Sequence, residues 1–168
     1  RVLFAGSRNI TISRRICNGL IAQLGKLGFY FLTGCAKGVD ESFRLALAES
    51  DFKDTSIVAC AFRDRAERLK GVYPLYVVPD GLHPRVALAK RTLHPLWMTC
   101  RCSLLILFPS DPIGRGSALA FKSAIYNNKP AFVVCPPRQG GRAEWRPADS
   151  DLYKVYPSSL FGVVEGYW

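Results

Sequence analysis

Three short segments of the sequence combine small residues with one basic side chain each, and this combination favours the binding of an anion. They are Gly6-Ser7-Arg8, Gly34-Cys35-Ala36-Lys37-Gly38 and Gly114-Arg115-Gly116-Ser117. Glycine lets a backbone approach a ligand closely, and N–H groups at the start of a helix carry partial positive charge. We therefore expect these segments to bind phosphate oxygens. The alternative is that the glycines serve only the geometry of three turns.

Single residues in and near these segments have more specific expected roles. Arg8, Lys37 and Arg91 are candidate cations for contacting phosphate, and the alternative for each is an ordinary surface charge. Ser7 and Ser117 either donate hydroxyl hydrogen bonds to phosphate or cap helices. The full set of expected phosphate-binding or nucleic-acid-binding residues is Gly6, Ser7, Arg8, Gly34, Ala36, Lys37, Gly38, Arg91, Arg115, Gly116 and Ser117.

Buried strands alternate with amphipathic helices along the chain, and this order predicts a parallel sheet covered by helices on both faces. The expected strands are Val2–Ala5, Phe29–Leu32, Ser56–Ala61, Ser103–Phe108 and Ala131–Cys135. The expected helices span about Arg14–Leu27, with Ser13 as N-cap and Gly28 as C-cap, a segment that begins with Asp40 as N-cap, and about Ser117–Tyr126. In such a sheet the three segments follow the carboxyl ends of strands, so we expect them to meet at one edge.

The remaining segments are less regular, and we interpret residues 1–168 as a single domain. Phe62–Gly71 is expected to form an exposed loop or short helix, Val72–Val78 a short strand or extended connection, and His83–Met98 one or two helical pieces. Residues 136–168 are expected to be an irregular basic loop, Pro136–Asp151, followed by an aromatic extension with an edge strand around Leu160–Val164. The chain begins with Arg1 directly at a strand, so we expect that an upstream segment has been trimmed or processed.

The overall composition limits the class of protein and of partner. A formal net charge of +10 and a pI of about 9.6 favour a polyanionic partner, namely single-stranded nucleic acid or a nucleotide. No run is long enough to span a membrane and no secretory signal is present, so no membrane partner is expected. The six cysteines lack the spacing of a zinc site, and we expect reduced thiols in a cytoplasmic protein without a metal.

The same segments resemble the DNA-processing protein A (DprA/Smf) family. Gly6-Ser7-Arg8 is similar to the G-S-R of that family, residues 33–40 (TGCAKGVD) to its S-G-x-A-x-G-[IV]-D, Gly116-Ser117 to its helix-opening turn, and Tyr73-Pro74 to its Tyr-Pro. The resemblance spans about Val2 to Val134. It implies a Rossmann-like, doubly wound α/β fold, binding of single-stranded DNA along the loop edge, and a role in DNA processing or recombination. A homodimer is compatible with it.

Departures from the family patterns affect the expected activity. The R-N-R segment of the DprA/Smf family is replaced here by Lys90-Arg91-Thr92. The related lonely-guy (LOG) hydrolases use P-G-G-x-G-T-x-x-E to supply a glutamate, and residues 113–120 (IGRGSALA) have no acid there. Dinucleotide and ATPase glycine motifs are also lacking, so no cofactor and no catalytic residue is expected. The alternative is a nucleotide sensor or a nucleoside 5′-monophosphate phosphoribohydrolase, with Asp40, Glu41 or Asp111 as its carboxylate.

Overall fold

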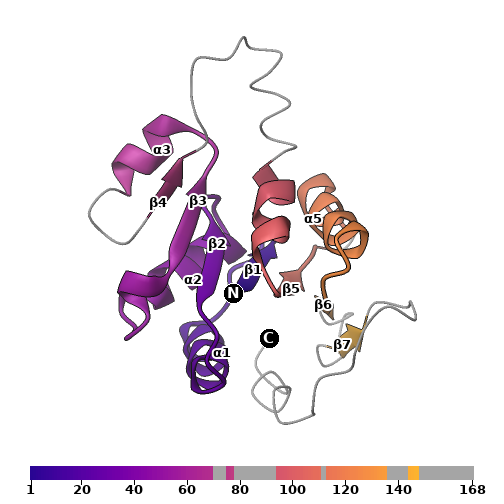
Figure 1. Ribbon diagram of the computed structural model, residues 1–168, viewed down its shortest axis with the longest axis horizontal. Helices are drawn as coiled ribbons and strands as arrows, with labels where there is room; N and C mark the ends of the chain where they lie inside the picture. Colours follow the sequence, from indigo (N-terminus) through magenta and orange to yellow (C-terminus); the bar gives the residue numbers. More distant parts are fainter. Residues whose placement is uncertain (70–74, 78–93, 111–112, 136–143, 148–168) are drawn as a thin grey trace.

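A seven-stranded sheet organises the computed structural model, which describes residues 1–69, 75–77, 94–110, 113–135 and 144–147 (Figure 1). Its strands and helices, together with a helical segment at 94–101, follow one another in the order β1 (Val2–Gly6), α1 (Arg14–Lys26), β2 (Phe31–Gly34), α2 (Val39–Ala48), the 3-10 turn η1 (Lys53–Thr55), β3 (Ile57–Cys60), α3 (Arg63–Arg68), β4 (Leu75–Val77), β5 (Leu104–Phe108), α5 (Arg115–Tyr126), β6 (Ala131–Cys135) and β7 (Glu144–Pro147).

The strand order in the sheet is β4-β3-β2-β1-β5-β6-β7. The strands from β4 to β6 pair in parallel, and β7 pairs antiparallel with β6. From β1 the chain adds strands in one direction as far as β4, and then it continues on the other side of β1 with β5. The topological switch point, where open α/β folds bind ligands, therefore lies between β1 and β5.

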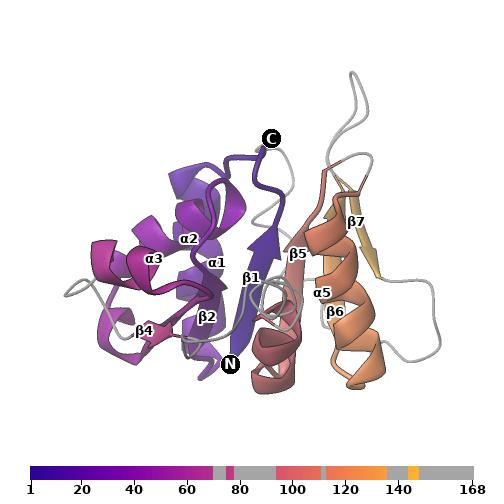
Figure 2. The ribbon, with the colours of Figure 1, turned by 90° about the horizontal axis from the view of Figure 1, so that it is seen from above.

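Helices cover both faces of this sheet (Figures 1 and 2). Successive side chains of β1 point to opposite faces and pack against different helices. Val2 and Phe4 belong to a core shared with α1 and α2, whereas Leu3 and Ala5 belong to a core shared with α5 and the segment at 94–101. The first core contains stacked aromatic rings, with the centroids of Phe4 and Phe43 3.9 Å apart. The predicted α/β, mainly parallel sheet with helices on both faces is confirmed.

Several boundaries differ from the sequence prediction. β2 begins at Phe31 instead of Phe29, and α5 begins at Arg115 with Gly114 as its N-cap, two residues before the expected start. Phe62–Gly71 does contain a short helix, α3. The interpretation of Pro136–Asp151 as a loop was wrong for residues 144–147, which form β7.

Other predictions concern local features or residues outside the description. Ser13 is the N-cap of α1, as expected, and its hydroxyl accepts from Ile16 N at 3.4 Å. The expected edge strand at Leu160–Val164 lies outside the described residues. In the part of the chain that the structure describes, no helix has both the length and the apolar character needed to cross a membrane.

Candidate functional site

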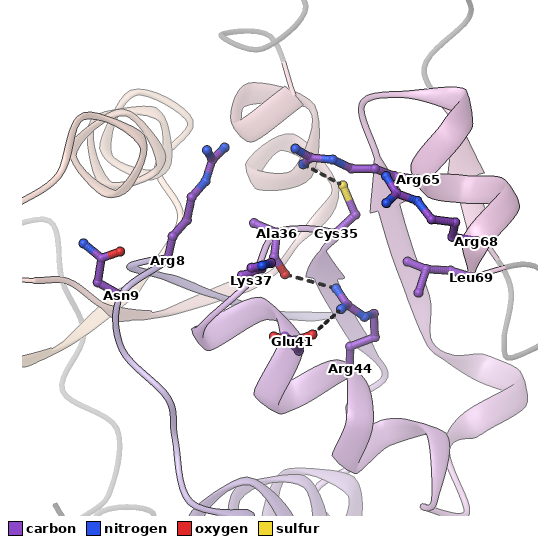
Figure 3. A pocket seen from close by; sticks show the side chains of 10 residues that line it. All are labelled: Arg8, Asn9, Cys35, Ala36, Lys37, Glu41, Arg44, Arg65, Arg68 and Leu69. Atoms are coloured by element: carbon purple, nitrogen blue, oxygen red, sulfur yellow. Dashed lines mark hydrogen bonds and ion pairs between the residues drawn. The ribbon is translucent and has the colours of Figure 1, made fainter.

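A pocket of about 580 Å³ lies beyond the carboxyl ends of β1, β2 and β3, and we call it the basic pocket (Figure 3). It is lined by Arg8, Asn9, Cys35, Ala36, Lys37, Glu41, Arg44, Arg65, Arg68 and Leu69. Figure 3 shows Arg8 on one side, Arg65 and Arg68 on the other, and the turn after β2 between them. The sheet topology thus places five cations around one cavity with a single carboxylate.

The five cations differ in whether they already form hydrogen bonds or ion pairs within the chain. The Arg44 guanidinium donates to Ala36 O at 3.1 Å and lies 3.6 Å from the Glu41 carboxylate. Arg68 pairs with Asp64 at 2.9 Å, although both side chains are exposed and such a pair contributes little. Arg8 and Lys37 are exposed and have no hydrogen bond or ion pair within the described residues. Their charges are therefore available to a ligand.

Arg65 occupies the wall of the pocket opposite Arg8. Its guanidinium nitrogen donates to the sulfur of Cys35 at 3.7 Å, and its guanidinium lies 5.3 Å from the centroid of the Phe62 ring. The ring and the sulfur fix the direction of this side chain. The positive charge remains at the pocket surface, since Arg65 is only half-buried.

The turn between β2 and α2 is held by close backbone contact with the loop after β1. Gly38 has a φ of 76°, and a Cβ there would lie 2.5 Å from Ser7 O and 2.6 Å from Arg8 O. Val39 N donates to Ser7 O at 3.1 Å across the same contact. This packing requires glycine at position 38, and it fixes the backbone of Arg8 relative to the turn that carries Lys37.

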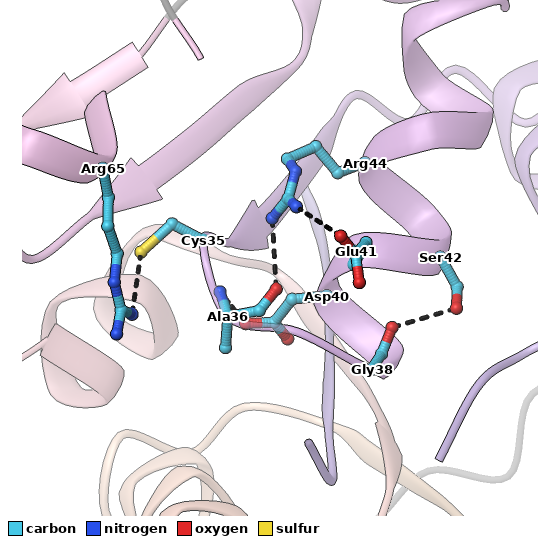
Figure 4. Close-up of polar contacts among 8 residues, drawn as sticks. All are labelled: Cys35, Ala36, Gly38, Asp40, Glu41, Ser42, Arg44 and Arg65. Atoms are coloured by element: carbon cyan, nitrogen blue, oxygen red, sulfur yellow. Dashed lines mark hydrogen bonds and ion pairs between the residues drawn. The ribbon is translucent and has the colours of Figure 1, made fainter. Parts of the chain in front are cut away.

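Asp40 closes this turn from inside, which corrects the prediction that it is an N-cap (Figure 4). Gly38 is the N-cap of α2, and the Asp40 carboxylate accepts from Ala36 N at 3.3 Å. A Cβ on Gly34 would collide with that carboxylate. Burial raises the pKa of Asp40 to about 7, against the opposing effects of the Ala36 N–H, Arg44 and Arg8. The carboxylate thus takes up the N–H of Ala36, one of the backbone groups that the sequence suggested for phosphate.

A smaller cavity of about 140 Å³, which we call the inner pocket, lies at the switch point beside the basic pocket. Arg8, Ala36 and Cys35 line both cavities, while Gly116 and Ser117 at the start of α5 line only the inner one. His94 also lines it and bonds the carbonyl oxygen of Ala59 at 2.8 Å. The three segments singled out in the sequence therefore meet at one edge of the sheet.

Not every predicted site residue lies in these cavities. Ser7 is buried, and its hydroxyl accepts from Asn9 N at 3.2 Å within the loop after β1, so among the described helices it caps none. Arg115 is exposed and lines neither pocket. Arg91 lies outside the described residues. Gly6 and Gly116 line the inner pocket.

Sequence reasoning missed Arg44, Arg65 and Arg68 as site residues. Arg44 follows Asp40 by one helical turn, so its spacing placed it on the same side of α2. Arg65 and Arg68 belong to the charged stretch after β3 that was interpreted only as exposed. Their place at the carboxyl end of a third parallel strand was the signal that could have identified them.

Comparison with known proteins gives a match among solved structures. No family model and no curated protein matches the chain. Among solved structures, DNA processing protein A (DprA) from Streptococcus pneumoniae superposes with a TM-score of 0.60 and 17% sequence identity. The chain has a DprA-like fold. The match covers 82% of this chain and 50% of DprA, so the chain spans about half the length of that protein.

The likeness to DprA confirms the fold that the sequence resemblance implied. The DprA-like fold also explains why the glycine-containing segments converge, because they follow β1 and β2 and precede α5 in a doubly wound sheet.

Proposed function

We propose that this protein binds single-stranded DNA through the basic pocket, in DNA processing or recombination. The observation that carries the proposal is the pair of exposed cations, Arg8 and Lys37, which lie on adjoining loops and make no hydrogen bond or ion pair among the described residues. The name of the DprA neighbour supports DNA as the ligand. The free cysteines of the described residues suit a reducing cytoplasm, where such a protein would act.

The shape of the pocket supports a chain of phosphates more than a single anion. Arg8 lies on one wall, and Arg65 and Arg68 lie on the other, with Lys37 between them (Figure 3). A strand that crosses the pocket would meet these cations in succession. Since they contact phosphates and not base edges, binding would be largely independent of base sequence.

The runner-up is a single nucleotide seated in the inner pocket, as a signal or as the substrate of a phosphoribohydrolase. The observation in its favour is that Arg8, Asp40 and Ser117 all line that cavity, a cation for phosphate beside a carboxylate and a hydroxyl. A carboxylate is the group that ribose hydrolysis would require. With a pKa of about 7, Asp40 would be partly ionised at neutral pH.

Direct binding measurements test the proposal. Fluorescence anisotropy would follow a labelled single-stranded oligonucleotide titrated with the wild type, Arg8→Gln and Lys37→Gln. We expect each variant to weaken binding about five- to tenfold, equal to about 1 to 1.4 kcal/mol, for homopolymers of different base alike. Lys53→Gln is the matched control, because Lys53 is exposed and precedes β3, at the opposite edge of the sheet.

The outcomes separate the two candidates. If Arg8→Gln and Lys37→Gln bound the oligonucleotide as tightly as the control Lys53→Gln, the basic pocket would be excluded as the DNA site. Tight binding of a nucleoside monophosphate, with no gain for the longer strand, would favour the nucleotide in the inner pocket. Release of free base from that monophosphate, followed by chromatography, would identify a hydrolase, and its loss in Asp40→Asn would assign the carboxylate.

A further inference from the structure

Two cysteines face each other at the carboxyl ends of neighbouring strands. β2 and β3 are parallel, with Thr33 opposite Val58 and Gly34 opposite Ala59, so the next residues in register are Cys35 and Cys60. Opposite residues on adjacent strands lie about 4.8 Å apart, within the Cα separation of about 4.4 to 6.8 Å that a disulfide needs. The side chain of Cys35 also packs against the small core that contains Cys60.

The two thiols have unequal surroundings. Cys35 is half-exposed and lines both pockets, so a small molecule can reach its sulfur, whereas Cys60 is fully buried. The neighbouring Cys60 thiol and a hydrogen bond from Arg65 lower the pKa of Cys35. Figure 4 shows the guanidinium of Arg65 beside the sulfur of Cys35. The interaction with Cys35, together with burial, raises the pKa of Cys60. Cys35 is thus the thiolate of the pair, and Cys60 retains its proton.

We propose that Cys35 and Cys60 form an oxidisable thiol pair, in which a peroxide oxidises the accessible Cys35 and the buried Cys60 closes a disulfide to it. The geometry carries this assignment, through strand register, access to Cys35 from the pocket and the guanidinium of Arg65 beside its sulfur. The proposal does not depend on what the basic pocket binds.

The chemistry balances with hydrogen peroxide as the oxidant. The Cys35 thiolate attacks one peroxide oxygen, the O–O bond breaks, and Cys35 becomes a sulfenic acid as hydroxide leaves. The Cys60 sulfur then attacks the Cys35 sulfur, the S–OH bond breaks, and the departing hydroxide takes the Cys60 proton as water. The hydroxide from the first step takes up the proton that Cys35 released when it ionised. In total, two thiols lose two electrons and two protons, and one peroxide becomes two water molecules.

The other described thiols lack this combination of access and partner. Burial raises the pKa of Cys17 to about 12 and that of Cys102 to about 11, so neither forms a thiolate readily. Cys100 is exposed, and its thiol donates to Asn127 Oδ1 at 3.6 Å, with no cysteine partner among the described residues. Cys100 is therefore the natural internal comparison for Cys35.

Mass spectrometry of the whole chain tests the proposal. The protein would be treated with one equivalent of hydrogen peroxide, free thiols blocked with N-ethylmaleimide, and the product unfolded and digested with trypsin. Cys35 and Cys60 fall on different tryptic peptides, residues 27–37 and 54–63, each with one cysteine. We expect these two peptides to be linked, and the link to disappear on reduction.

Variants distinguish the role of each thiol. Cys60→Ala should leave a sulfenic acid on Cys35 that dimedone traps, because the resolving thiol is missing, and Cys100→Ser should form the link as the wild type does. At pH 6, iodoacetamide should alkylate Cys35 at least tenfold faster than Cys100, and Arg65→Gln should reduce that advantage. Wild-type protein that yields no linked peptide, or in which Cys100 reacts before Cys35, would overturn the proposal.

Discussion

Asp40 is the residue whose observed role differs most from the role expected from the sequence. A glycine turn followed by a helix suggested an empty anion site, but the site is filled by a carboxylate of the same chain, bonded to Ala36 N. Because this carboxylate is buried, its charged form is unfavourable and its pKa rises. The side chain thus holds the turn in place, but it lowers the folding stability of the chain at high pH.

Asp40→Asn should remove the loss of stability that the wild type suffers at high pH. The pKa of Asp40 rises from its ordinary value of 3.8 to about 7 on folding, so the folded chain holds a proton that the unfolded chain has lost. The wild type therefore loses stability as pH rises from about 4 to 7. Asparagine keeps an acceptor for Ala36 N but does not ionise. We expect the variant to gain about 3 kcal/mol relative to the wild type between pH 4.5 and pH 8.

Urea unfolding at both pH values measures this change. Asp51→Asn serves as the control, since Asp51 is exposed and its removal should leave the pH dependence of the wild type intact. If the difference between wild type and Asp40→Asn were the same at pH 4.5 and pH 8, the raised pKa of Asp40 would be refuted.

Cys35 offers a second prediction, which rests on the proposed DNA binding. A thiolate beside Arg65 partly neutralises the wall of the basic pocket, and Cys35→Ser replaces it with a neutral hydroxyl. One unit of charge removed at this range corresponds to about 1 kcal/mol. We expect the variant to bind a single-stranded oligonucleotide about fivefold more tightly at low salt. Anisotropy titration would reveal it, and weaker binding would contradict it, while Cys100→Ser should match the wild type.

Prediction from sequence succeeded at residues whose role depends on local pattern. Ser13 was recognised as an N-cap from its position before an amphipathic segment, and the structure has it there. The contact of Asp40 with Ala36 N and the closeness of Cys35 to Cys60 were not recognised. The first depends on how the turn closes, and the second on which strands become neighbours in the sheet. Pattern within one segment does not specify which strands become neighbours.

At the scale of elements, the parallel strands were predictable because each is a short, nearly continuous apolar run. β7 was not, because Glu144–Pro147 has neither an apolar run nor alternation and lies among glycine and proline residues. Its conformation comes from antiparallel pairing to β6 at the end of the sheet, where Pro147 is tolerated on an edge strand.

The turn between β2 and α2 gives the prediction that belongs to this scale. Gly38→Ala would place a residue with a side chain at a φ of 76° and press its Cβ against two carbonyl oxygens of the preceding loop. We expect a loss of about 3 kcal/mol in the free energy of unfolding. Weaker oligonucleotide binding should accompany it, because the loop that must move carries Arg8.

Gly28→Ala is the matched control for that substitution. Gly28 has a similar φ of 80°, but nothing lies within 4 Å of the position of an added Cβ. Gly28→Ala should therefore lower the free energy of unfolding only by the cost of a positive φ in a residue with a side chain, about 1 kcal/mol. Chemical denaturation of both variants measures the two losses, and equal losses would show that the contact between Gly38 and the loop after β1 contributes nothing.

At the scale of the whole molecule, the sheet gathers five cations around a pocket at one of its edges. Parallel pairing puts the carboxyl ends of β1, β2 and β3 together, so cations from three distant parts of the sequence surround one pocket. Lys53, which precedes β3, falls at the opposite edge. A net charge of +10 alone would attract nucleic acid to any face, whereas the proposed DNA site would neutralise a few phosphates at one place.

Salt dependence distinguishes these two modes of binding. For single strands, each neutralised phosphate contributes about 0.7 to the slope of log K against log salt concentration. Contacts from Arg8, Lys37, Arg65 and Arg68 predict a slope of about −2 to −3. The double variant Arg8→Gln/Lys37→Gln should reduce its magnitude by about 1.4, whereas Lys53→Gln should leave it unchanged. If both variants changed the slope equally, binding would follow net charge, and the pocket would have no special part in it.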